Sequence, residues 1–165
     1  QRSLGLRHEE SAKASPKDFL KEALKTNAVT ILDGTKGGQS RKVPITSAEQ
    51  IDALKKASEI QGENKSLIEN DKSYIEFSNN AYRDNHEERF HDNRHAFAQA
   101  RYRDLTGAEC PLRAGVSHGR DHFEYLSREL GLSTQEARSK DKEVRKIISK
   151  ELGHTRPDIT NTYLG

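Results

Sequence analysis

The sequence predicts a mainly α-helical protein with one small antiparallel β-hairpin, an α+β fold. Apolar residues recur every three or four positions over much of the chain, and helix-start signals precede several of these stretches. Two short apolar segments flank a glycine pair in the first third of the chain. The 165 residues suffice for one domain with its own core, so we expect residues 1–165 to form a single domain.

The amino-terminal part begins with a predicted helix and then a hairpin. Residues 15–24 are amphipathic and carry Pro16 in the expected first turn. Residues 28–32 and 41–45 predict two strands, because both are short and apolar and the Lys-Gly-Gly turn separates them. Together they indicate a helix that leads directly into a two-stranded sheet.

The middle of the chain is predicted to be helical, with one interruption. Thr46 and Glu49 have the spacing of a capping box, which predicts a helix that continues to Ile60. Residues 61–72 are polar and predict a loop, and residues 74–105 predict mostly helix.

The carboxyl-terminal part predicts two further helices. Residues 107–119 contain three glycines and a proline, so they predict a loop. Residues 121–130 predict a helix that Gly131 stops. A second capping box, formed by Ser133 and Glu136, predicts a helix that ends before Gly153.

Composition narrows the cellular setting. Cys110 is the one cysteine, which excludes an intramolecular disulfide and fits a reducing compartment. The sequence has no apolar run long enough to span a membrane and no signal-peptide pattern. We therefore expect a cytoplasmic protein that has no contact with a membrane.

Net charge alone does not indicate a nucleic-acid partner, because the formal charge is only +2. Its distribution is uneven: residues 138–156 carry seven Lys or Arg against three acids, and residues 62–92 carry eight acids against four bases. A polarised molecule can bind a polyanion with one face, but solvated helix faces explain such runs equally simply. Charge by itself favours the simpler explanation.

The closing segment, Glu151 to Gly165, contains the most informative pattern. Gly153 ends a helix, Pro157 starts another short turn or helix, and this geometry can return Tyr163 toward His154. A tyrosine that acts as a nucleophile needs an electrophile and groups that absorb negative charge. Phosphodiester chemistry fits, because arginine forks bind phosphate oxygens two at a time.

Suitable cations occur in three other segments. Arg7 is followed by Glu10 just before a helix, and Lys36 lies in the connection of the predicted hairpin. His91 and Arg94 are three residues apart and so share one helix face. Each has a simpler reading: a surface ion pair for Arg7, ordinary turn chemistry for Lys36, and packing for the His91–Arg94 pair. Tyr163 could likewise be a packing aromatic.

A metal site is the other chemistry that the histidines could support. His86 and His91 resemble a His-Glu-x-x-His motif but are one residue too far apart to share a helix face. His91 with His95, and His118 with His122, have the spacing of paired ligands, but Cys110 stands alone. We expect no metal, and we read His118 and His122 as a feature of a helix start.

Taken in order, these segments resemble the catalytic domain of the tyrosine recombinases, the phage integrase family. The shared features are a Gly-Leu-Arg-x-x-Glu segment, a hairpin lysine, His-x-x-Arg, Leu-Gly-His and a tyrosine nine residues later. The six matching residues are Arg7, Lys36, His91, Arg94, His154 and Tyr163. The match spans nearly the whole chain, and the ordered set is far more specific than any one segment. The resemblance implies the fold of that catalytic domain.

The resemblance also implies a reaction. Tyr163 would attack a DNA phosphate to form a 3′-phosphotyrosyl intermediate, so neither a metal nor ATP nor any other cofactor would be needed. Arg7 and Arg94 would bind the non-bridging oxygens, and Lys36 would protonate the departing 5′-oxygen. His91 would act as acid or base toward the tyrosine.

Two further roles complete the implied active site. His154 would donate a hydrogen bond to the phosphate, and Glu10 would orient Arg7 or the backbone near it. Arg41, Lys42 and Arg156 are candidates for contacts to DNA.

The partners implied are double-stranded DNA attachment sites, three further copies in a homotetramer, and accessory DNA-bending proteins. The expected setting is the bacterial cytoplasm, on the DNA of a phage or other mobile element that integrates.

The chain departs from the family pattern in three ways. His154 lies 63 positions after His91, farther than is typical, so we read residues 107–142 as an insertion. The amino-terminal DNA-clamping domain is missing from these residues, as is the helix after the tyrosine that docks onto a neighbouring subunit.

Two alternatives remain at this stage. One is a DNA-binding regulator, or a remnant, with this fold but no strand exchange. The other is a type IB topoisomerase-like enzyme that relaxes DNA as a monomer.

Overall fold

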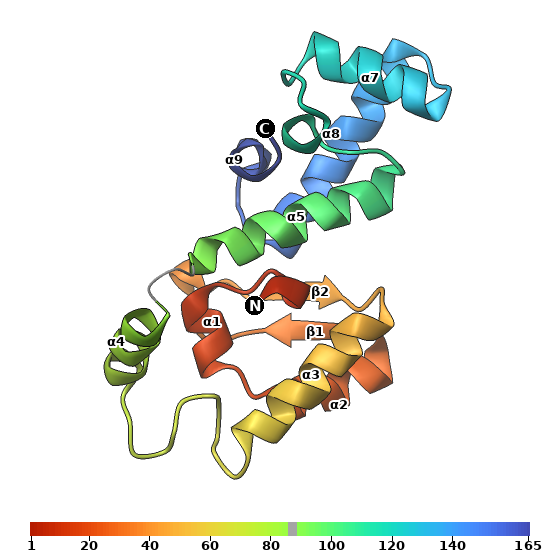
Figure 1. The fold of residues 1–165 in the computed structure, drawn as a ribbon. Coiled ribbons are helices and arrows are strands. Elements are labelled where there is room, and N and C mark those ends of the chain that lie inside the picture. Colours follow the sequence, from red (N-terminus) through yellow and green to blue (C-terminus); the bar gives the residue numbers. More distant parts are fainter. Residues whose placement is uncertain (86–88) are drawn as a thin grey trace. The chain divides into compact units, whose positions relative to one another are not determined.

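A computed structural model describes residues 1–85 and 89–165, and Figure 1 shows its helices and its small sheet. The chain divides into two compact units, residues 1–94 and residues 95–165, each of which has its own packing. The boundary lies inside helix α5 (Phe90–Thr106), where the sequence shows no linker. The predicted mainly helical fold with one small antiparallel sheet is confirmed.

The first unit is built on a two-stranded sheet. Strand β1 (Ala28–Ile31) pairs antiparallel with β2 (Arg41–Pro44), and Val29 lies opposite Val43. Val29 and Val43 are completely buried, which is why two such short strands can persist. The predicted hairpin is therefore confirmed, although each strand ends one residue earlier than expected.

Helices cover this sheet. Helix α2 (Pro16–Thr26) packs against both β1 and α3 (Ala48–Gln61), and α1 (His8–Lys13) packs against α4 (Tyr74–Asp84). A short 3₁₀ turn, η1 (Arg2–Leu4), lies against α3. Ser15 caps α2 and Pro16 occupies its first turn, so the helix begins where the sequence predicts.

The predicted capping box of α3 was shifted by one residue. Ser47, not Thr46, is the N-cap, and the side chain of Gln50, not Glu49, reaches back to the Ser47 backbone N–H at 3.1 Å. Gln50 is buried, and its amide nitrogen also donates to the Ser3 carbonyl at 2.8 Å. A buried amide with a partner on each side fits this position better than the charged Glu49 would.

The single helical stretch predicted over residues 74–105 is two helices. Ser73 caps α4 with Glu76 in a capping box, and α4 ends before Asn85. Helix α5 then begins at Phe90. The His86 that the metal hypothesis used lies outside the described residues, as do residues 87 and 88.

The second unit consists of helices. It contains most of α5, α6 (Pro111–Ala114), α7 (Arg120–Leu130) and α8 (Thr134–Glu151), then the 3₁₀ turn η3 (Pro157–Thr160) and α9 (Asn161–Leu164). Helices α7 and α8 pack on each other around Leu126 and Ala137.

Local signals predicted most of this unit. Gly131 ends α7 with φ 65°, and Ser133 and Glu136 cap α8 as expected. Gly153, with φ 69°, follows the end of α8. The stretch 107–119 was predicted to be all loop, but Pro111 begins the single turn α6 there.

Within the described part of the chain, no helix is both long enough and apolar enough to cross a bilayer.

Gly34 lies in the β1–β2 connection and packs against the backbone at the start of α1. Its φ is 71°, and a β-carbon on this residue would lie 2.8 Å from the Glu10 nitrogen and from the Glu9 carbonyl oxygen. Those atoms are backbone and cannot move aside cheaply. The close approach therefore requires glycine at this position.

We expect Gly34→Ala to lower the free energy of unfolding by about 3 kcal/mol, because it adds a steric clash to a left-handed backbone. Chemical denaturation followed by circular dichroism would measure the change. Gly37→Ala is the matched control: its φ is 74°, but its β-carbon would meet no atom within 4 Å. The control should cost only about 1 kcal/mol, and equal losses in both variants would contradict the close-approach argument.

Candidate functional site

The buried carboxylate of Glu10 organises the candidate site in the first unit. Glu10 is 1% exposed and is the third residue of α1. It accepts hydrogen bonds from the Arg7 backbone N–H at 2.7 Å and from Arg7 Nη1 at 2.6 Å. The expected pairing of Glu10 with Arg7 therefore exists, and it also caps the helix.

Arg41 binds the same carboxylate from strand β2. Its Nη2 donates to Glu10 Oε2 at 2.7 Å and to the Gly5 carbonyl at 3.3 Å, and its Nη1 donates to Glu10 Oε1. The Arg41 side chain is only 4% exposed. Arg41 was expected to contact DNA; in the structure its side chain lies in the interior, bound to the Glu10 carboxylate.

Arg94 approaches from helix α5. Its Nη1 donates to the Gly5 carbonyl and lies 3.8 Å from Glu10 Oε2. Arg94 is 1% exposed. Glu10 and Gly5 thus hold three arginines from three separate segments beside one another, and Arg7 is the most exposed of the three.

The charges of this cluster affect the ionisation of Glu10. Burial alone would raise the pKa of Glu10, but the hydrogen bonds and charge of Arg41, together with those of Arg7, outweigh burial and hold the pKa below its ordinary value of 4.5. Glu10 is therefore ionised at neutral pH, as it must be to orient the guanidinium groups.

A hollow of about 300 Å³ opens beside this cluster. Three residues that the sequence singled out line it: Arg7, His91 and Arg94. Arg94 is buried but lines this hollow, so an anion would contact its side chain from inside the hollow. The lining also includes one carboxylate, that of Glu9. The two guanidinium groups and the size of the hollow suit a phosphate group.

Sequence reasoning missed the aromatic wall of the hollow. His8 stacks on Phe90 with ring centroids 4.4 Å apart, and Tyr82 packs within 5.2 Å of His8. Burial lowers the pKa of His8, so this ring is neutral at neutral pH. The one available signal was the position of His8 next to Arg7.

Three other candidate residues lie on the surface. Lys36 is exposed in a short 3₁₀ turn between the strands, and Lys42 is exposed on β2. Arg156 is exposed and lies 3.7 Å from Asp158.

The second unit places Tyr163 next to His154. Their rings are stacked, with centroids 5.4 Å apart and an interplanar angle of 22°. The turn after Gly153 therefore returns the tyrosine toward the histidine, as the sequence predicts. Tyr163 is 4% exposed.

Two residues of α5 hold Tyr163 from another side, and sequence reasoning named neither for this role. The His95 ring lies 4.8 Å from the Tyr163 ring, and Gln99 Nε2 donates to the Tyr163 carbonyl at 3.2 Å. His95 directly follows Arg94 in the sequence of α5.

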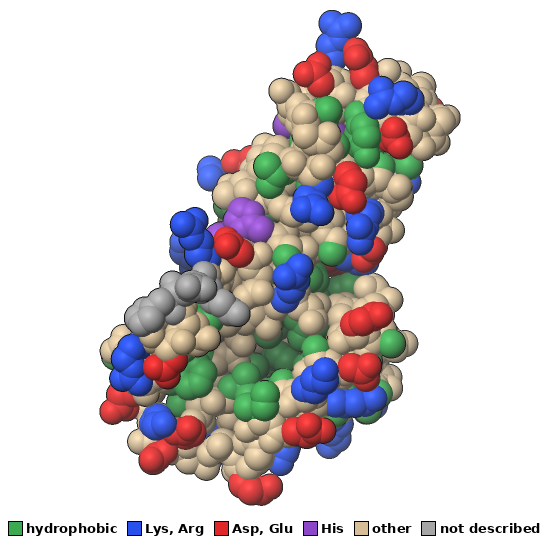
Figure 2. All heavy atoms as spheres, viewed as in Figure 1, with side chains coloured by type: hydrophobic (Ala, Val, Ile, Leu, Met, Phe, Trp, Pro, Cys, Tyr) green, Lys and Arg blue, Asp and Glu red, His purple; other side chains and the backbone are tan. Residues whose placement is uncertain are grey.

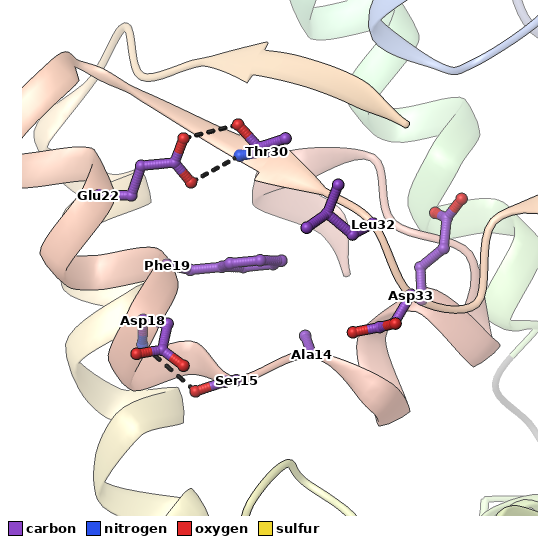
Figure 3. Close-up of a pocket in the computed structure, with 9 residues that line it drawn as sticks. Ala14, Ser15, Asp18, Phe19, Glu22, Thr30, Leu32 and Asp33 are labelled. Carbon is purple, nitrogen blue, oxygen red and sulfur yellow. Dashed lines mark hydrogen bonds between the residues drawn. The ribbon is translucent and has the colours of Figure 1, made fainter. Parts of the chain in front are cut away.

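A second hollow in the first unit, of about 210 Å³, has the opposite character (Figure 3). Phe19 projects from α2 toward Leu32, and Asp18 and Asp33 lie on either side of the space. Glu22 accepts from the Thr30 N–H at 2.8 Å and from the Thr30 hydroxyl at 2.6 Å. No Lys, Arg or His is among its described lining residues, so this hollow would repel a phosphate.

On the face drawn in Figure 2, charge does not single out a binding surface. Figure 2 shows lysine and arginine side chains interspersed with aspartate and glutamate on the face drawn. Among the residues described, no three His, Cys, Asp or Glu side chains are placed to share a metal ion.

We expect Glu10→Gln to lower the free energy of unfolding at pH 7 by about 3 kcal/mol, because it removes the charge that the buried arginines surround. The pKa of Glu10 is lower in the folded than in the unfolded state. Its contribution is thus present above pH 4.5 and lost as the pH falls below that value. Denaturation followed as the pH is lowered from 7 should show the difference between the two proteins shrinking once the pH falls below 4.5.

Glu9→Gln is the control for this comparison. The Glu9 side chain is 42% exposed and pairs with Lys13 on the surface, so its loss should cost under about 1 kcal/mol. If Glu9→Gln and Glu10→Gln were equally costly, the Glu10 cluster would not have the structural role assigned to it.

Comparison with known proteins adds one match. A family model described as Integrase matches residues 1–102. This range includes Arg7, Lys36, His91 and Arg94 but neither His154 nor Tyr163. No curated protein and no solved structure matches the chain.

Proposed function

Because this chain belongs to the integrase family, an assignment that supports DNA recombination of the integrase type, we propose that it cleaves and rejoins DNA through the nucleophile Tyr163. The observation that carries the proposal is the hollow lined by Arg7, His91 and Arg94. It offers two guanidinium groups and an imidazole to one anion, and the buried Glu10 keeps Arg7 in place. Tyr163 and His154, side by side in the second unit, supply the remaining chemistry.

The proposed reaction begins when the Tyr163 oxygen attacks a DNA phosphorus. The tyrosine proton passes to a base, for which His91 is the candidate, and the bond from phosphorus to the 5′-oxygen breaks. Lys36 gives a proton to that leaving oxygen, and the 3′-phosphate stays bound to the tyrosine. A 5′-hydroxyl from another strand then reverses these steps, so no nucleotide cofactor or metal is consumed.

Charge stabilisation would come from three residues. Arg7 and Arg94 would bind the non-bridging oxygens, whose negative charge grows in the transition state, and His154 would donate a further hydrogen bond. Fixed donors are effective because they need no reorganisation at the moment of reaction. The hydrogen bonds of Arg7 to Glu10 and of Arg94 to Gly5 fit that requirement.

The proposed reaction requires a change in the burial of Tyr163. A side chain that is 4% exposed must become accessible before its hydroxyl can reach a phosphate in DNA. DNA binding would have to supply this change.

The proposed partners follow from the reaction. The substrates are duplex attachment sites, and two duplexes exchanging strands call for four copies of the protein, aided by accessory DNA-bending proteins. Lys42 and Arg156 are exposed cations that can contact the DNA backbone, which would make binding sensitive to salt. We place this activity on bacterial DNA, in a phage or other integrative element.

We expect a protein–DNA adduct when the protein is mixed with a nicked suicide duplex that carries its attachment site. Tyr163→Phe should abolish the adduct, because the ring remains but the nucleophilic oxygen is gone. A denaturing gel measures the adduct, and a gel-shift assay confirms that the variant still binds DNA. Binding without an adduct from either protein would favour a DNA-binding regulator or remnant. Relaxation of supercoils by the monomer would favour a type IB topoisomerase-like enzyme.

We expect Lys36→Ala to slow adduct formation by about 10²–10⁴-fold, because the 5′-oxygen then leaves without a proton donor. A duplex with sulfur in place of that bridging oxygen should restore the rate, since a thiolate leaves without protonation. Lys42→Ala, on the same hairpin, should weaken DNA binding without this dependence on the leaving atom. A Lys36→Ala defect of equal size on both duplexes would contradict the role of proton donor.

A further inference from the structure

The short helix that carries Tyr163 is tied down at both ends by one side chain. Arg145, on α8, donates from Nη1 to Asn161 Oδ1 at 2.9 Å and from Nη2 to the Gly165 carbonyl at 3.2 Å. Asn161 is the first of the four residues of α9 and Gly165 directly follows the last, so Tyr163 lies between them. A single helical turn is not stable by itself, so its orientation depends on such contacts.

Asp141 fixes the position of Arg145. Both carboxylate oxygens accept from Arg145 Nε, at 3.0 and 2.9 Å, and the two residues are 3% and 5% exposed. Residues 141 and 145 are one helical turn apart on α8, which is the spacing at which such a pair can form. Because the pair is buried, water competes little for these hydrogen bonds.

Other polar groups surround the Asp141 carboxylate. The Tyr102 hydroxyl donates to Asp141 Oδ1 at 2.7 Å. Burial, and then the neighbouring Asp141, raise the pKa of Tyr102 far above its ordinary value, so this hydroxyl keeps its proton. Two histidines also lie near the carboxylate: His122 Nδ1 is 3.7 Å from Oδ1, and His118 Nε2 is 3.7 Å from Oδ2.

Residues 107–142, the predicted insertion, act on the Tyr163 segment in two ways. They supply Asp141, which holds Arg145, and they supply α6, which packs against α9. A β-carbon on Gly165 would lie 3.0 Å from the Leu112 nitrogen, so the end of α9 lies directly against α6.

We propose that Arg145, held by Asp141, is a positioning residue that fixes the helix carrying Tyr163. This inference rests on the proposed role of Tyr163 as the nucleophile. A nucleophile must approach phosphorus along a narrow range of directions, and small displacements are costly in rate. Arg145 is one of the seven Lys or Arg in residues 138–156. Its burial and its bonds to Asp141, Asn161 and Gly165 give it an internal role rather than a place on a charged surface.

The first test measures the anchoring without DNA. We expect hydrogen–deuterium exchange in peptides covering residues 157–165 to be about tenfold faster in the Arg145→Lys variant than in the unaltered chain. Lysine cannot donate to Asp141, Asn161 and Gly165 together as the guanidinium does. Arg101→Lys is the matched control, because Arg101 forms a similar forked pair with Glu151 between α5 and α8. It should leave exchange in residues 157–165 unchanged.

A milder variant tests the same anchoring contact in case Arg145→Lys does not fold. Asn161→Ala removes one anchoring contact from an exposed residue and leaves the buried pair intact, so exchange in residues 157–165 should rise by about fivefold. Thr162→Ala, at the exposed neighbouring position, should have no effect. Unchanged exchange in both Arg145→Lys and Asn161→Ala would overturn the proposal.

The second test uses the protein with the nicked suicide duplex. At saturating DNA, Arg145→Lys should form the adduct about 10–100-fold more slowly than the unaltered protein, and Asn161→Ala a few-fold more slowly. Both variants should bind the duplex with unchanged affinity. Equal or faster adduct formation in both variants would overturn the positioning role while the nucleophile stands. If the unaltered protein forms no adduct, the proposed function fails, and the exchange experiment still decides whether Arg145 holds the Tyr163 segment.

Discussion

The first unit depends on one buried carboxylate. Glu10 accepts hydrogen bonds from Arg7 at the start of α1 and from Arg41 on β2, and Arg94 of α5 lies close to the same group. Burying charge is costly, and the cost is offset only when every partner is well placed. Gly34 contributes to this arrangement, because its lack of a side chain lets the strand connection pass directly over the Glu10 backbone.

The second unit repeats the same physical solution with different residues. Asp141 holds Arg145, and Arg145 holds the two ends of α9, much as Glu10 holds the guanidinium groups of Arg7 and Arg41. In both units a buried carboxylate converts a flexible arginine into a rigid donor. The residues proposed to bind phosphate and the residue proposed to attack it are therefore both supported by interior ion pairs.

Local signals made much of this fold predictable. Ser133 with Glu136, Gly131 and Gly153 set helix ends through bonds that span only a few residues, and the structure confirms them. The capping box of α3 was misplaced because Gln50 has a distant partner, the Ser3 carbonyl, that no local pattern reveals. The proximity of Glu10 to Arg7 could be read from a spacing of three residues, whereas the aromatic wall around His8 comes from distant helices.

The sequence by itself determined the helical class, the hairpin, the ordered set of six candidate residues and the return of Tyr163 toward His154. These features depend on neighbours along the chain or on the order of motifs. Only the tertiary structure decided which arginines are internal: Arg41 and Arg145 look like surface cations in the sequence but are buried against Glu10 and Asp141. The physical reason is that a charged side chain is buried only where a distant segment supplies its partner, and sequence spacing does not record that meeting.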